Sequence, residues 1–241
     1  MRYKGIHCIT PYKGMNYMDI LNVTLKTNKL EPLKAFYKTV LGCSIERETD
    51  HRFELSCGLT TIVFDHDQVA DAPFYHFAFD IPANQFQQAK QWVLDRTPLL
   101  IENGKDDIYF AFSKAHSLYF EDPAGNIIEF IARLKTNAES TTPFSMASIQ
   151  RMSEIGLVVE DKMAVAEQLA QYNIFPPLHE NVTDHPLTFI GDRETSVYIL
   201  LVEPERKWLF SPKVSKIFPI DILLSSGVKT GITPYHQFYI E

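Results

Sequence analysis

Hydrophobic residues in the first part of the chain follow two spacings, one typical of strands and one typical of helices. Every second residue within positions 19–26 is apolar, which predicts a strand with one buried face. Within positions 30–40 the apolar residues recur every three or four positions, as in an amphipathic helix, and Gly42 ends that pattern. Two further strand-like runs, FELSCG and TTIVFDH, complete a first unit near His66.

The order of one strand, one helix and further strands occurs twice more. The second unit has the strand FYHFAFDI, the helix ANQFQQAKQWVLDR and the strands IYFAF, SLYFED and NIIEFIAR. The third begins with SEIGLVVED, where Asp161 is expected to cap the helix KMAVAEQLAQYN, and continues with LTFIGD, SVYILLVE and FPIDILLSS. Repetition of one supersecondary unit predicts an α+β fold built from such units.

These patterns divide the chain into segments. Residues 1–17 are a mixed, turn-rich extension, and units follow at 18–67 and 72–133. Residues 134–149 are polar and rich in Ser and Thr, which predicts a linker. The third unit occupies residues 150–241 and includes a C-terminal tail, GVKTGITPYHQFYIE, that is expected to add an edge strand.

Composition narrows the class of protein. The chain of 241 residues is 45% hydrophobic and 22% charged, which excludes general disorder. Its 23 basic and 30 acidic residues give a net charge of -7, which argues against nucleic acid or an anionic membrane as partner. The three cysteines lack a C-x-x-C spacing, and no apolar run is long enough for a signal peptide or a membrane span. We therefore expect a reduced, cytoplasmic protein.

Two polar residues stand among apolar neighbours in strands of the second unit. Period-two alternation puts Glu129 on one face of its strand together with Ile127 and Ile131. His76 lies in the strand FYHFAFDI, on the face opposite its aromatic neighbours Tyr75, Phe77 and Phe79. A buried carboxylate is costly unless it is paired, hydrogen-bonded or bound to a metal. The pair is therefore either a metal site or a salt-bridged glutamate with an ordinary core histidine.

The second unit resembles a module of the vicinal oxygen chelate superfamily, which includes glyoxalase I, fosfomycin-resistance proteins, extradiol ring-cleaving dioxygenases and bleomycin-binding proteins. The resemblance rests on DPAGNIIEF, which follows a strand with His and a helix, and on LKAFYKTVLGCSIERE in the first unit. It implies βαβββ modules, two of which, at 18–67 and 72–133, pair into a cup that holds the reactive site. The third unit is then left over.

The same resemblance implies metal ligands on the first and last strands of paired modules. His76 and Glu129 match the His and Glu positions of the second module, and Asn22 stands where the first module usually has His. An amide oxygen is a weak ligand for iron, manganese or zinc. Either a divalent metal binds through His76, Glu129 and Asn22, or metal binding is lost and the cup holds an organic ligand.

Three other residues are candidates for the same site. His116 begins a strand and could act as an acid or base if it points into the cup; otherwise it is an exposed strand end. Glu154 and Asp221 match the His and Glu positions of the third unit. Each is either paired with a basic residue or part of an altered site.

The function implied by the resemblance is a metal-dependent glyoxalase-like or dioxygenase-like enzyme that acts on a small oxygen-bearing molecule. The alternative is a metal-free protein that sequesters an aromatic or antibiotic-like molecule. The unpaired third unit favours a symmetric homodimer formed through residues 150–225. A lid made of residues 1–17 and the C-terminal tail is the alternative.

Overall fold

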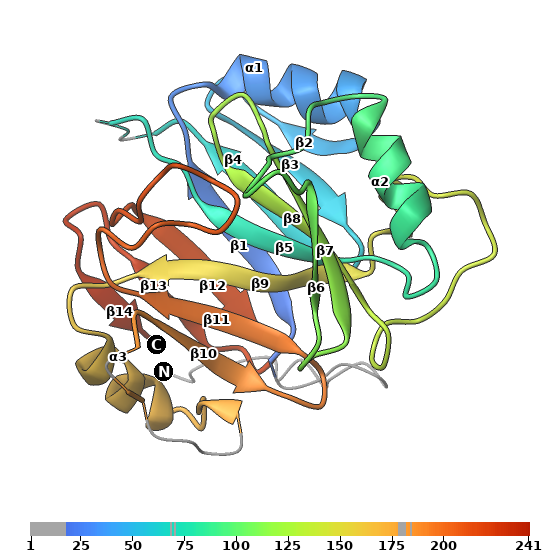
Figure 1. Ribbon diagram of the computed structural model, residues 1–241. Coiled ribbons are helices and arrows are strands. Elements are labelled where there is room, and N and C mark those ends of the chain that lie inside the picture. Colours follow the sequence, from blue (N-terminus) through green and yellow to red (C-terminus); the bar gives the residue numbers. More distant parts are fainter. Residues whose placement is uncertain (1–17, 68, 70, 178–181, 184) are drawn as a thin grey trace, which may run out of the picture.

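The computed structural model describes residues 18–67, 69, 71–177, 182–183 and 185–241. The predicted extension at 1–17 therefore lies outside the described residues. The chain forms two seven-stranded sheets that pack against each other (Figure 1). Helices α1 and α2 lie at one end of the sheets in this view and α3 lies at the opposite end.

The elements occur in the predicted order. The first unit consists of β1 (Ile20–Lys26), α1 (Leu30–Ala35) with the adjoining π-helical turn η1 (Phe36–Val40), β2 (Ile45–Glu48), β3 (Arg52–Cys57) and β4 (Thr60–Asp65). The second consists of β5 (His76–Asp80), α2 (Phe86–Leu94), β6 (Asp107–Phe110), β7 (Ala115–Glu121) and β8 (Ile127–Arg133). The third consists of β9 (Arg151–Val158), α3 (Lys162–Ala170), β10 (Leu187–Asp192) and β11 (Val197–Val202). The C-terminal strands are β12 (Ile220–Leu224), β13 (Lys229–Ile232) and β14 (Phe238–Ile240).

The α+β class with repeated modules is confirmed, but the modules share sheets in an unexpected way. One sheet has the order β14-β13-β12-β1-β4-β3-β2, and the other has the order β10-β11-β9-β5-β8-β7-β6. The second module therefore continues into the third unit through β5 and β9, which are antiparallel. Strand β12, expected in the third unit, pairs instead with β1 of the first module. The cup expected from the first two modules is not formed by them.

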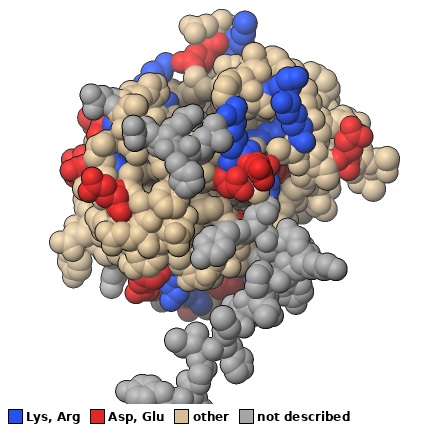
Figure 2. Space-filling model, turned by 90° about the horizontal axis from the view of Figure 1, so that it is seen from below, with Lys and Arg blue, Asp and Glu red and all other residues tan. Residues whose placement is uncertain are grey.

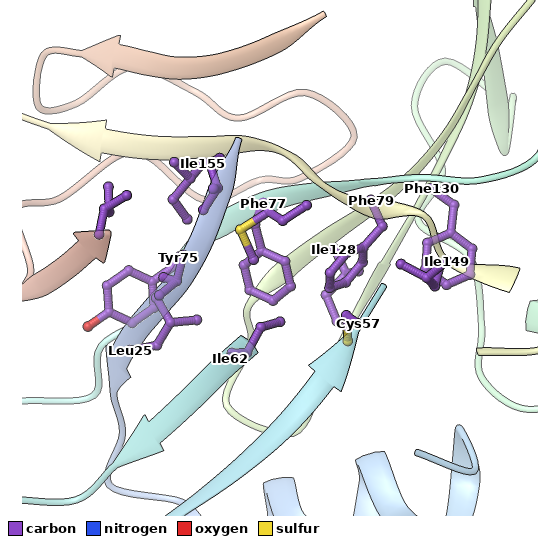
Figure 3. Packing of buried hydrophobic residues seen from close by; sticks show 14 of the residues in the cluster. Leu25, Cys57, Ile62, Tyr75, Phe77, Phe79, Ile128, Phe130, Ile149 and Ile155 are labelled. Carbon is purple, nitrogen blue, oxygen red and sulfur yellow. The ribbon is translucent and has the colours of Figure 1, made fainter. Parts of the chain in front are cut away.

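The two sheets meet through an apolar core, shown in Figure 3. Phe77 and Phe79 of β5 and Phe130 of β8 point into it, where they meet side chains such as Ile62 from the other sheet. Burying such rings is worth a few kcal/mol each, which favours contact between the first and second modules through these faces. The opposite face of β5 and β8, which carries His76, is left for the third unit.

Residues 134–149 pack against the body of the protein and do not form a free linker. The side-chain amide of Asn137 donates to the carbonyl oxygens of Ile81 (2.8 Å) and Ile131 (3.1 Å). Phe144 and Met146, the latter in the 3₁₀ turn η2 (Met146–Ser148), are buried. Because the third unit is fixed to the second module, the reason given for a homodimer no longer holds. The homodimer itself stays a prediction.

An ionic network joins the two sheets. Arg151 of β9 donates to Asp19, which precedes β1, at 2.8 Å and to Asp80 of β5 at 3.0 Å. Asp80 also pairs with Arg133 at the end of β8. Asp19 and Asp80 are 1% and 0% exposed, so the arginines compensate two fully buried carboxylates.

Charges on the surface are mixed. On the face shown in Figure 2, acidic and basic side chains both occur, in small groups among uncharged residues. Among the described residues, no helix is long and apolar enough to cross a membrane.

Replacing Asp80 with alanine is expected to lower the free energy of unfolding by about 3 to 5 kcal/mol, because the buried Arg133 and the partly buried Arg151 lose the partner they share. Urea denaturation followed by circular dichroism measures this change. The control is Asp50→Ala in an exposed bend, which should change stability by less than about 0.5 kcal/mol. A loss under about 1 kcal/mol for Asp80→Ala, the range of a surface ion pair, would contradict a structural role for the network.

Candidate metal centre and ligand cavity

The turn between β7 and β8 positions the first candidate ligand. The carboxylate of Asp122 accepts hydrogen bonds from the backbone amides of Ala124 (2.9 Å) and Asn126 (3.1 Å), which closes the DPAGN turn. Asn126 Oδ1 in turn accepts from the backbone amide of Tyr75 at 2.8 Å. The motif therefore fixes the start of β5, where His76 is the next residue.

His76 presents one ring nitrogen to the site. Its Nδ1 donates to the carbonyl oxygen of Ile127 at 3.1 Å, which leaves Nε2 with a free lone pair. Nε2 lies 3.7 Å from Oε2 of Glu129. His76 and Glu129 thus lie on the same face and converge, as the alternation of the two strands predicts.

Glu154 of β9 completes a group of three. In the sheet register, Ala78 of β5 is opposite Glu129 on one side and Glu154 on the other. The small side chain of Ala78 leaves space above it, so both carboxylates reach toward His76. Ligand atoms of the three residues all lie within 4.8 Å of one another, and all three residues are buried.

Electrostatics show that this group is costly without a cation. Burial, with the charge of Glu154 as the next cause, raises the pKa of Glu129 to about 8. Burial also raises the pKa of Glu154, although Arg133 opposes that shift. Burial lowers the pKa of His76 to about 4, so its imidazole is neutral at pH 7. One neutral imidazole and two carboxylates are a donor set that suits a divalent ion such as manganese, iron or zinc.

Arg133 holds one of these carboxylates in place. Its guanidinium donates to Oε1 of Glu154, to Asp80 and, at 3.0 Å, to Oγ of Ser153. Glu154 is therefore paired with a basic residue, and it also belongs to the site. Its second oxygen has no partner among these contacts and is available to a metal.

The group lies in a cavity of about 650 Å³ on the outer face of the sheet that contains β5. This volume is within the usual range for small-molecule sites. Aromatic side chains form much of its wall: Phe110, Phe112, Tyr119, Phe189, Tyr198 and Trp208. Arg133, Arg193 and Arg206 add positive charge.

Two residues predicted for the site lie elsewhere. Asn22 is on β1 of the other sheet, opposite Thr61 and Leu223, and does not line the cavity. His116 is on β7, with its ring 5.0 Å from that of Phe86 in α2, on the face opposite the cavity-lining Tyr119. Neither residue is among those that line this cavity.

Asp221 is also outside the site. It is exposed on β12 and accepts a hydrogen bond from the hydroxyl of Tyr239 at 2.6 Å. In the third unit, the position that corresponds to Glu129 is Leu200 of β11, which lies opposite Gly156 two residues after Glu154. Leu200 lines the cavity, so this fourth corner of the group is apolar.

The sequence patterns did not single out some of the residues at the site. Arg133 is four residues after Glu129 on the same strand, so period-two alternation places the two on one face and would have found it. Arg206 and Trp208 lie between β11 and β12, outside any strand or helix, where no periodic signal exists.

Comparisons with known structures confirm the fold. Glyoxalase I from Zea mays is similar with a TM-score of 0.55, at 13% identity, over 92% of this chain and 91% of that chain. A protein of Bacillus subtilis subsp. subtilis str. 168, described as a candidate dioxygenase, gives a TM-score of 0.51 at 13% identity over 88% of this chain and 68% of that chain. The chain thus has the fold of vicinal oxygen chelate proteins.

Sequence comparison adds one shorter similarity. A family model described as toxoflavin-degrading enzyme matches residues 152–206, a segment that includes both Glu154 and Arg206. This is less than half of the chain. No curated protein matches the sequence.

Glu129→Gln is expected to stabilise the metal-free protein, increasingly so from about pH 5 to about pH 8. The pKa of Glu129 is about 8 in the folded chain and 4.5 ordinarily, so the folded state binds more protons in this window. Stability of the unsubstituted chain therefore falls as pH rises, by at most roughly 1.4 kcal/mol per pH unit, and glutamine removes that loss. Urea denaturation in the presence of EDTA at three pH values measures the difference.

The control is Glu48→Gln at the exposed end of β2, which should show no such dependence on pH. If the stability difference between Glu129→Gln and the unsubstituted protein were the same at every pH, the pKa of Glu129 would not be raised.

Proposed function

We propose that this protein is a metal-dependent enzyme that acts on a small oxygen-bearing molecule in the cavity beside β5. The observation that carries the proposal is the convergence of His76, Glu129 and Glu154 within 4.8 Å. The proposed ligands are Nε2 of His76 and one carboxylate oxygen from each glutamate. Similar folds in glyoxalase I and in a candidate dioxygenase are consistent with this class of activity.

The physical support is the cost of the group itself. Two buried carboxylates repel each other, and one arginine is shared between Glu154 and Asp80. A divalent cation would offset this repulsion and would make use of the free lone pair of His76. If the group served only as a structural ion pair, His76 would have no role in it.

The side chains around the group suggest how a substrate would bind and react. His76, Glu129 and Glu154 would hold the metal, and Leu200, at the fourth corner of the group, offers no ligand atom. The metal, when bound, would polarise substrate oxygens and stabilise the negative charge that develops on them. Tyr119 lies beside Glu129 and favours its ionised form, and the aromatic wall excludes water from the bound molecule.

The second candidate is a metal-free protein that sequesters an aromatic molecule. The aromatic wall of the cavity favours it, because ring stacking binds such molecules without a metal. Metal binding by the purified protein separates the two functions.

After treatment with EDTA, the protein is expected to bind one Mn²⁺ per chain. His76→Ala, Glu129→Gln and Glu154→Gln should each weaken binding by about 10-fold to 100-fold or more, since each removes one donor. Electron paramagnetic resonance of free Mn²⁺ measures the affinity.

The matched controls are Asn22→Ala and His116→Ala, which should bind Mn²⁺ like the unsubstituted chain because neither residue reaches the cavity. Asn22→His should not improve binding, for the same reason. Absence of saturable binding of Mn²⁺, Fe²⁺ and Zn²⁺ would remove the metal-dependent function and leave the sequestering protein.

A further inference from the structure

The segment between β11 and β12, residues 203–219, crosses from the third unit to the second module. The backbone amide of Phe210 donates to Glu102 at 3.0 Å, and the Lys213 ammonium contacts Glu121 at 2.9 Å. The ring of Phe210 stacks on that of Tyr119 with centroids 4.8 Å apart. The segment is therefore anchored at several points along one side of the cavity.

Two residues of this segment, Arg206 and Trp208, line the cavity next to the candidate metal centre. Trp208 is 5% exposed, and its ring centroid is 5.0 Å from that of His76. The guanidinium carbon of Arg206 lies 5.5 Å from the centroid of Trp208. Glu205 and Phe210, on either side of the pair, have positive φ angles of 66° and 60°. Such backbone conformations cost free energy and persist only where the surrounding structure holds them in place.

Arg206 differs from Arg133, the other arginine beside the candidate metal centre, in having no acidic partner among the residues that the structure describes. Arg133 is paired with both Asp80 and Glu154. No carboxylate among the described residues pairs with Arg206, although the side chain is half-buried. Burial lowers the pKa of Arg206, yet a guanidinium remains protonated at neutral pH. Arg206 is therefore a partly desolvated cation in the cavity that has no direct carboxylate partner among the described residues.

We propose that Arg206 and Trp208 form a subsite for a planar aromatic anion, with the negatively charged oxygen on Arg206 and the ring against Trp208. This deepens the proposed function and rests on it for the role of the bound molecule as substrate. A planar ring is favoured over a compact anion such as phosphate, because a single guanidinium and an indole ring supply few donors but a flat apolar surface. The contact between Trp208 and His76 places such a ring at the edge of the candidate metal centre.

The test compares two probes of the same shape, 2-naphthoate and 2-naphthamide, which differ in charge. Isothermal titration calorimetry of the full chain, with and without Mn²⁺, is expected to show tighter binding of 2-naphthoate. Arg206→Met should weaken the binding of 2-naphthoate by about tenfold, which is the effect of losing one charge-assisted hydrogen bond. The same variant should leave the affinity for 2-naphthamide unchanged. Arg206→Lys should recover part of the lost affinity for 2-naphthoate. Trp208→Leu should weaken the binding of both probes.

The control is Arg96→Met, an exposed arginine that lies over the ring of Trp92 at 4.1 Å and does not line the cavity. It should change the affinity for either probe by less than about twofold. Circular dichroism and urea denaturation of each variant verify folding. Equal binding of the two probes by the unsubstituted chain, or equal loss of both in Arg206→Met, would overturn the anionic subsite.

Failure of this subsite is distinguishable from failure of the metal centre. Arg206→Met should bind Mn²⁺ at least as well as the unsubstituted chain, since a nearby positive charge is removed. Normal Mn²⁺ binding with no charge selectivity would reject the subsite alone. Charge selectivity without Mn²⁺ binding would reject the metal-dependent enzyme and leave an anion-binding cavity.

Discussion

Alternation of side chains along β5 and β8 is the constraint on which the rest of the structure depends. Phe77, Phe79 and Phe130 are fully buried between the two sheets, and their burial brings the first and second modules together. Because successive strand residues point to opposite faces, the same packing directs His76 and Glu129 away from the core. The hydrophobic core and the candidate metal centre are thus two faces of the same strands.

Residues of the third unit help to line the cavity on the face that this packing leaves open. Its strand β9 extends the sheet beside β5, and Glu154 meets Glu129 above Ala78. The segment after β11 then closes one side of the cavity before the chain crosses to the other sheet. Each sheet contains one complete unit and three strands from the C-terminal part of the chain.

Charge pairing divides the arginines near the cavity into two kinds. Arg133 contacts Glu154 at the candidate metal centre and also Asp80, which Arg151 connects to Asp19 beside the other sheet. The position of one candidate ligand is therefore coupled to the contact between the sheets. Arg206 has no such partner in the part of the chain that the structure describes, which is the state expected of a group that binds a charged ligand.

The sequence by itself determined the order of the strands and helices and the faces of the strands, because period-two and helical spacings are local properties of the chain. It also placed His76 and Glu129 on one face of one module. Which strands share a sheet depends on burial between residues distant in sequence, and only the tertiary structure decided that β9 and not β1 lies beside β5. For this reason Glu154 reaches the site and Asn22 does not. Arg206 and Trp208 lie in an irregular segment without periodicity, so their place beside His76 follows from the path of the folded chain alone.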